Sequence, residues 1–100
     1  MNTISFDVTR EAMQLIQRIV ERAEHLADQL GRPRPSRARL TMDLVACHAA
    51  CPLQLTELLV AGPAEFAHDV WGIHHHIDRR TGELRDCFFP RYARANNPLA

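Results

Sequence analysis

The feature that most constrains the fold is a periodic stripe of apolar residues between positions 12 and 30. Its members follow one another at alternating spacings of four and three residues: Ala12, Ile16, Ile19, Ala23, Leu26 and Leu30. This period places them on one face of an α-helix, whereas a half-buried strand would alternate every second residue. Thr9 is a favoured N-cap residue, and Gly31 followed by Pro33 marks a helix end. We therefore predict a helix over about residues 10–30.

The remainder of the chain carries the signals of three further helices. Ser36 suits the N-cap of a helix over about residues 37–50, whose apolar residues cover more than one face and predict the most buried helix of the fold. A short helix is expected over about residues 54–61. Pro63 suits the first position of a last helix, over about residues 63–80.

The last helix has its own apolar stripe and one unusual residue. Its stripe repeats at four-three-four spacing: Phe66, Val70, Ile73 and Ile77. Gly72 lies within this helix, where glycine costs about 1 kcal/mol relative to alanine. We therefore expect close packing at Gly72.

These elements predict a mainly α fold, a small bundle of three to four helices with a short extended C-terminal tail or hairpin. A chain of 100 residues suffices for one domain, 1–100, around one core. Residues 83–92 are expected to run extended, with a hairpin through Thr81 and Gly82 as the alternative. The ends, 1–8 and 93–100, are expected to fray.

The charge balance narrows the classes of function. Twelve acidic and twelve basic residues give a formal net charge of zero, and every basic residue is an arginine. Nucleic-acid-binding domains are usually strongly basic, so this balance does not favour that class. No window approaches the run of about 18 apolar residues that a membrane-spanning helix needs. An odd number of cysteines and no recognisable secretory signal favour the reducing cytoplasm.

Three cysteines and one histidine form the candidate metal site: Cys47, Cys51, His75 and Cys87. Thiolates and imidazoles are the ligands that tetrahedral zinc prefers. Cys47 and Cys51 are four residues apart, which places them along one helix face instead of in the tight loop of a zinc knuckle. We therefore favour the interpretation that both are small buried apolar residues, and we expect no cofactor.

Nucleophilic catalysis by a Cys–His pair is a second chemical interpretation. Adjacent Cys47 and His48 point about 100° apart on a helix, whereas His48 and Cys51 are three residues apart and could touch. No carboxylate at matching spacing and no glycine-rich turn for an oxyanion hole accompanies them. We do not expect an enzyme. The run of three histidines at 74–76 is expected on a solvated helix face rather than at a ligand-binding or pH-sensing site.

Two clusters of arginines are candidates for binding a partner. The first occupies the linker and the start of the second helix: Arg32, Arg34, Arg37 and Arg39. The second lies toward the C-terminus: Arg79, Arg80, Arg85 and Arg91. Guanidinium groups bind carboxylates and phosphates in a planar, bidentate geometry. Three interpretations stay open: an acidic protein surface, a nucleic acid, or a solvated surface balanced by nearby acidic residues.

Two segments of the sequence form a recognisable pattern. They are ACHAACPLQLTELLVA at 46–61 and FAHDVWGIHHHIDRRTGELRDCFFPRY at 66–92. Together they resemble a family of small uncharacterised proteins that are encoded by tailed phages and prophages, with a likeness spanning about residues 44–92. That family has an arginine within the segment that reads Ile73–His76 here. The resemblance implies a phage or mobile-element origin, and it transfers no catalytic or binding residue.

The leading hypothesis is a small phage or mobile-element accessory protein that binds a host protein or protein complex stoichiometrically. Inhibition of a host defence complex, in the manner of an anti-CRISPR protein, is its sharpest form. The alternative is a small nucleic-acid-binding regulator, with or without zinc held by Cys47 and Cys51. A third hypothesis is a homodimer formed through the apolar stripe of residues 12–30.

Overall fold

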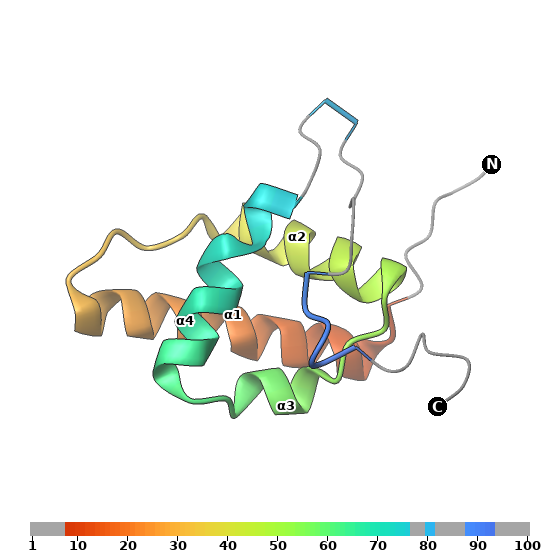
Figure 1. Cartoon of the computed structure of the whole chain (residues 1–100), viewed down its shortest axis with the longest axis horizontal. Helices are drawn as coiled ribbons and strands as arrows, with labels where there is room; N and C mark the ends of the chain where they lie inside the picture. The colour runs from red at the N-terminus through yellow and green to blue at the C-terminus, as the bar shows by residue number, and fades with distance from the viewer. Residues whose placement is uncertain (1–7, 77–79, 82–87, 94–100) are drawn as a thin grey trace.

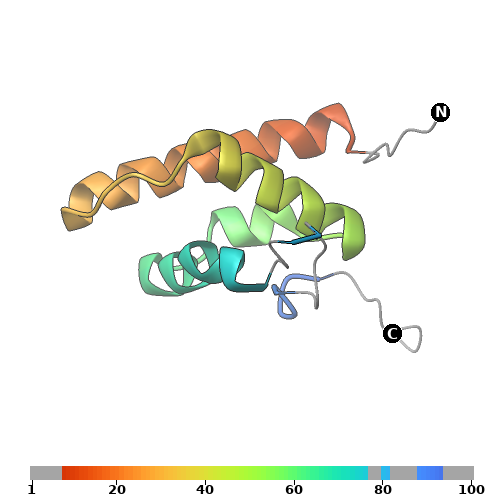
Figure 2. The ribbon, with the colours of Figure 1, turned by 90° about the horizontal axis from the view of Figure 1, so that it is seen from above.

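The computed structural model describes residues 8–76, 80–81 and 88–93. Its elements, in chain order, are α1 (Arg10–Leu30), α2 (Arg37–Ala50), α3 (Leu55–Leu59), α4 (Pro63–Gly72) and the 3₁₀-helix η1 (Ile73–His76). Helix α1 runs along the length of the molecule and packs against each of the other α-helices (Figure 1). Helices α3 and α4 lie on the same side of α1 (Figure 2). The mainly α bundle that the sequence predicts is therefore confirmed.

The ends of α1 follow the local signals. The Thr9 hydroxyl accepts a hydrogen bond from the backbone N–H of Ala12 at 3.0 Å. Gly31 ends the helix with φ +66°, a left-handed conformation that favours glycine. The apolar stripe is buried up to Leu26, but Leu30 is 53% exposed. Leu30 remains outside the core because the last turn of α1 projects beyond the neighbouring helices (Figure 1).

Helix α2 is less buried than its composition predicts. It begins as expected, because the Ser36 hydroxyl accepts from the N–H of Arg39 at 3.2 Å. It buries Leu40, Asp43, Leu44 and Cys47, whereas α1 buries a longer row of residues, and Met42 is 68% exposed. The prediction that this helix is the most buried is therefore wrong. Helix α2 packs chiefly on α1, so its opposite face meets solvent.

Helix α4 begins at Pro63 as predicted and is shorter than expected. The α-helical part ends at Gly72 and continues as the single 3₁₀ turn η1, while residues 77–79 lie outside the described part of the chain. A Cβ atom at Gly72 would lie 3.0 Å from Cζ of Phe88. The expected close packing at Gly72 is thus confirmed, and its partner is an aromatic ring from the C-terminal region.

Residues 88–93 pack back onto the helices. Phe89 is buried in the core, and the N–H of Tyr92 donates to the Phe89 carbonyl at 2.9 Å, so the chain turns here instead of running extended. Ala93 then forms a single antiparallel bridge with Leu53. Ala93 and the partly buried Val8 thus contact the bundle, while the other residues that are expected to fray, 1–7 and 94–100, lie outside the described part of the chain. The rest of the expected extended segment and the hairpin's Gly82 fall at 82–87, outside the described residues.

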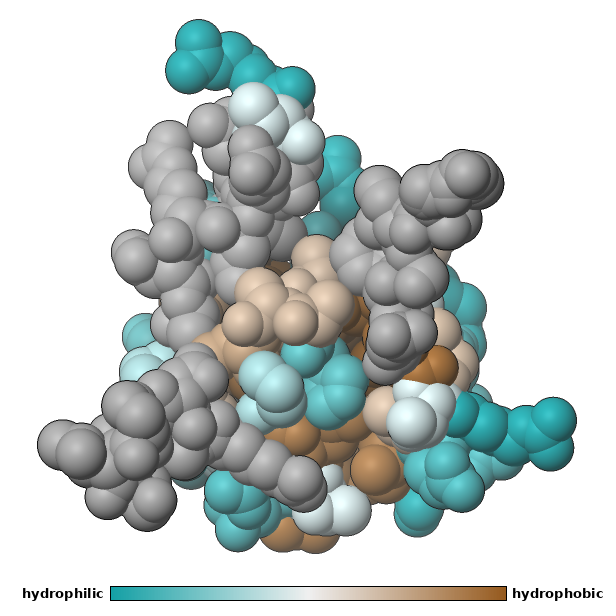
Figure 3. Space-filling view, turned by 90° about the vertical axis from the view of Figure 1, so that its right-hand side faces the viewer, coloured by the Kyte–Doolittle hydropathy of each residue, from teal (hydrophilic) through white to brown (hydrophobic). Residues whose placement is uncertain are grey.

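The apolar faces of the helices are mainly buried against one another in the core. At the end of the molecule where α1 begins and α2 ends, hydrophilic side chains project at the margins and apolar ones gather toward the middle (Figure 3). Ile16, Ile19 and Ala23 of the α1 stripe have no exposed surface. A homodimer through this stripe would therefore require the bundle to open. Among the described residues, no helix combines the length and apolarity needed to cross a membrane.

Candidate functional site

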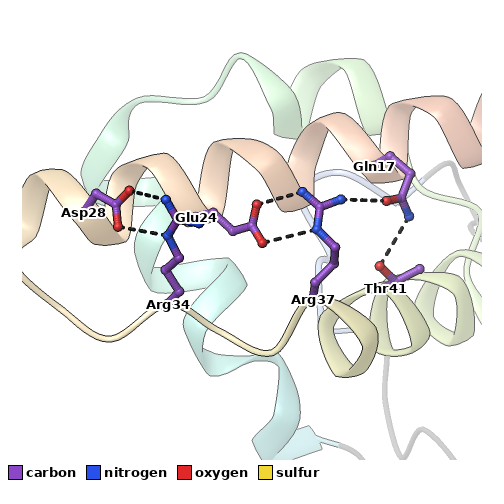
Figure 4. A network of polar contacts seen from close by, with 6 residues as sticks. All are labelled: Gln17, Glu24, Asp28, Arg34, Arg37 and Thr41. Carbon is purple, nitrogen blue, oxygen red and sulfur yellow. Dashed lines mark hydrogen bonds and ion pairs between the residues drawn. The ribbon is translucent and has the colours of Figure 1, made fainter.

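Two of the four arginines in the linker (residues 31–36) and the first turn of α2 are bound to α1. Arg34 reaches back to Asp28 near the end of that helix: its Nε and Nη2 atoms donate to the two carboxylate oxygens at 3.0 and 2.6 Å (Figure 4). These hydrogen bonds lower the pKa of Asp28 below its ordinary value and raise that of Arg34. The pair is well exposed, so it guides the path of the linker more than it stabilises the fold.

Arg37 makes the second connection, one turn nearer the start of α1. Its Nη2 and Nε atoms donate to the carboxylate of Glu24 at 2.7 and 3.2 Å, and Nη1 donates to Gln17 at 3.2 Å. The Gln17 amide nitrogen in turn donates to the hydroxyl of Thr41 on α2 at 3.3 Å (Figure 4). This chain of contacts, with the Arg34 pair, forms what we call the α1–linker network. It holds the linker and the first turn of α2 alongside α1.

A groove lies between this linker and α4. It has a volume of about 590 Å³, within the range of about 300–1,000 Å³ that is typical of ligand pockets. Its apolar lining comes from the linker, α2, α4 and η1: Pro33, Pro35, Leu40, Val70, Trp71 and Ile73. We call this surface the linker groove. It combines a proline-rich segment with the single tryptophan of the chain.

The polar groups of the linker groove are unevenly distributed. Arg32 and Arg39 are both exposed, and neither forms an ion pair with any other described residue. The guanidinium of Arg32 lies 5.5 Å from the centroid of the Trp71 ring, a cation–π distance. Asp43 is only 7% exposed and has an interaction partner of its own. His74, also in the lining, packs its ring 3.9 Å from that of His75.

Arg22 supports the end of α3 and the start of α4, and no sequence motif marks it. Its Nη1 and Nη2 atoms donate to the carbonyls of Leu59 and Ala61 at 2.5 and 2.7 Å. Its guanidinium also lies 4.3 Å from the centroid of the Phe66 ring. The carbonyls at a helix end lack intrahelical partners, so Arg22 satisfies groups at the end of α3 and fixes the entry to α4. The available signal was its place three residues after Ile19, at the edge of the apolar stripe.

The C-terminal arginine cluster is only partly described. Arg91 forms an ion pair with Glu65 on α4, and Glu65 also accepts from the hydroxyl of Tyr92 at 3.2 Å. Burial, followed by the hydrogen bond to Glu65, raises the pKa of Tyr92 above its ordinary value. Arg80 is exposed in a turn and has an interaction partner. The remaining predicted members, Arg79 and Arg85, fall outside the described residues.

The candidate zinc ligands do not assemble in the described part of the chain. Cys47 has no exposed surface and belongs to the hydrophobic core, and Cys51 is 2% exposed. His75 is exposed on η1, and Cys87 lies outside the described residues. Across residues 8–76, 80–81 and 88–93, no three His, Cys, Asp or Glu residues are arranged to hold a metal ion. The two buried cysteines serve as core residues in this arrangement.

Two further polar side chains bear on the catalytic interpretation. His48, in the last turn of α2, makes a structural contact: its Nδ1 atom accepts from the backbone N–H of Leu53 at 3.0 Å. Asp69 is 5% exposed, with Oδ1 at 3.2 Å from Nδ1 of His68. Its Oδ2 atom has no hydrogen-bond partner among the described residues. The available signal for Asp69 was its place three residues after Phe66 and four before Ile73, on the apolar face of α4.

Comparison with known proteins places the chain in a family. Residues 11–94 match the model of the DUF6874 family, a family of unknown function. No curated protein matches the chain. No solved structure matches it either. The family match does not address the phage resemblance, which stays a prediction. Because the matched residues extend from the first turn of α1 to the bridge at Ala93, the chain belongs to the DUF6874 family.

Proposed function

We propose that this protein acts by stoichiometric binding of another protein, with the linker groove as its contact surface. One observation carries the proposal: a half-buried tryptophan, apolar walls, and two arginines without ion-pair partners among the described residues share one concave surface. Tryptophan and arginine are enriched where protein interfaces concentrate their binding energy. The α1–linker network supports the proposal, because a held linker loses less conformational entropy on binding than a free one.

The expected partner is a host protein or protein complex. The reason is the resemblance of residues 44–92 to proteins of phages and prophages. Within that class, the most specific partner we propose is a host defence complex. The same proposal makes the protein a binder and not an enzyme. We expect it to work in the cytoplasm, because an odd cysteine count suits a reducing compartment.

A nucleic acid is the competing partner, since bases stack on aromatic rings and phosphates bind arginines. One feature disfavours it. Arg34, Arg37 and Arg91 are already compensated by carboxylates, which removes three of the described guanidiniums from contact with a phosphate backbone. Retardation of an oligonucleotide at low ionic strength, lost in Arg32→Gln/Arg39→Gln, would favour the nucleic acid instead.

Affinity capture from host extract, quantified by mass spectrometry, tests the proposal. The wild-type chain is compared with Trp71→Ala and with Arg39→Glu, after both variants are shown to have wild-type helicity and cooperative unfolding. Matched controls are Val60→Ala, which shortens an apolar side chain that is 79% exposed outside the groove, and Arg10→Glu on α1. We expect both groove variants to lose the partner by about tenfold or more while the controls retain it. Equal recovery by all five chains would refute the proposal.

A further inference from the structure

We infer that the segment of the partner that enters the linker groove is acidic and carries an apolar side chain; this inference rests on the proposed function and names the chemistry of the partner. It follows from the different contacts of the four arginines in the linker and the first turn of α2. Arg34 and Arg37 form ion pairs with Asp28 and Glu24 of α1. The two outer members, Arg32 and Arg39, have no such compensation within the described residues.

The uncompensated charge lies on the groove and not elsewhere on the linker. Both outer arginines are part of its lining and both are exposed, so an incoming carboxylate can reach them without breaking an ion pair among the described residues. Arginine binds carboxylates through two parallel hydrogen bonds, which fixes orientation as well as charge. Acidic residues of the partner therefore complement this part of the surface.

The interior of the groove calls for a different group. Besides the arginines, the lining includes Pro33, Pro35, Leu40 and the ring of Trp71. Removing this surface from water favours an apolar side chain, and an aromatic ring gains the most from a tryptophan neighbour. The fitting ligand thus combines acids with an apolar residue.

Two measurements on the full chain test this inference. A displayed library of random peptides is first selected on the wild-type protein and on Arg32→Gln/Arg39→Gln. Arg10→Gln/Arg18→Gln is the matched control, since it removes the same charge from two exposed residues of α1. Selected peptides are then synthesised and titrated, with the emission of Trp71, the only tryptophan, as the reporter. Oligothymidylate is titrated in parallel.

We expect the selected peptides to be enriched in Asp and Glu around an aromatic or aliphatic residue, and to change the Trp71 emission. Replacing their acids by Gln and Asn should weaken binding about tenfold or more, as should Arg32→Gln/Arg39→Gln, while Arg10→Gln/Arg18→Gln binds as wild type. Rising salt should weaken the acidic peptides and spare their neutral versions.

Several results would overturn the inference. They are selected peptides with no excess of acids, equal binding of acidic and neutral peptides, no change in Trp71 emission, and oligothymidylate that competes at equal affinity. These failures differ from a failure of the proposed function. If host capture still depends on Trp71 while acidic peptides do not bind, the groove binds a protein of other chemistry, and only the inference falls.

Discussion

The guanidinium of Arg22 joins three segments that are far apart in the sequence. It lies on α1, hydrogen-bonds to carbonyls at Leu59 and Ala61, and covers the ring of Phe66 on α4. A single cation thus supplies donors to carbonyls at the C-terminal end of α3 and in the turn that leads into α4. Arg22 therefore stabilises the fold, whereas Arg32 and Arg39 line the groove and are exposed.

We predict that Arg22→Ala lowers the free energy of unfolding by about 2–3 kcal/mol, because two hydrogen bonds from a charged donor are lost and two carbonyls are left unsatisfied. Arg22→Lys should recover only part, since an ammonium group cannot reach both carbonyls as a planar fork. Urea unfolding of the purified variants measures this. Arg18→Ala, one turn earlier and exposed, is the control and should cost less than about 0.5 kcal/mol. A loss for Arg22→Ala no larger than for Arg18→Ala would contradict the assignment.

Tyr92 offers a second prediction at the scale of single residues, because it is the only tyrosine in the chain. Burial and then the hydrogen bond to Glu65 raise its pKa, so its phenol should ionise above the ordinary value of about 10. A folded-state pKa above the unfolded one gives stability that is present below the unfolded value and lost as pH rises through the folded value.

A titration followed by phenolate absorbance measures the pKa of Tyr92 directly. Glu65→Gln should lower it only in part, since burial is the larger cause and persists in that variant. Ionisation of Tyr92 at or below its ordinary value in the folded chain would show that residues 88–93 do not pack on α4 as described.

At the scale of elements, the helices that were predicted well are those whose ends carry local signals. Thr9 and Ser36 cap α1 and α2 through their own hydroxyls, and Pro63 is the first residue of α4. Each of these signals acts within the first turn of the helix that it starts. The end of α4 was predicted too late, because the change to a 3₁₀ turn occurs where Gly72 packs against Phe88. Phe88 is distant in the sequence, so the periodicity of the helix gives no sign of this contact.

The linker is the element whose role was least predictable. The arginines of the linker and of the first turn of α2 are alternately spaced along the sequence, yet Arg37 pairs with Glu24 and Arg39 lines the groove. Which acid lies opposite each guanidinium depends on how the linker runs along α1, and that path is fixed by tertiary packing. The sequence therefore located the cluster of arginines but could not predict which of them form ion pairs with α1 and which line the groove.

A charge swap tests the α1–linker network. Glu24→Arg alone places two guanidiniums together, and Arg37→Glu alone places two carboxylates together, so each should lower the urea midpoint. The double variant restores an opposite-charge pair and should recover most of that loss, with a coupling that shrinks at high salt. Additive losses in the double variant would indicate that this pair does not hold the linker. Denaturation midpoints of the four chains complete the cycle.

At the scale of the whole molecule, α1 acts as the axis on which the other helices pack, and its apolar stripe is used inside the chain. The predicted bundle and most of its core followed from this stripe. The groove did not, because it lies between the linker and α4, and Trp71 and the two prolines carry no periodic signal that relates them. The surface left for a partner is thus a product of how the elements meet.

Amide hydrogen exchange of the chain alone and in complex with its captured partner tests the central claim most directly. If the linker groove is the contact surface, exchange should slow over residues 32–40 and 70–74 and remain unchanged in α3, which lies elsewhere on the bundle. Protection confined to α3 or to the first turns of α1, with unaltered exchange in the groove segments, would contradict the account.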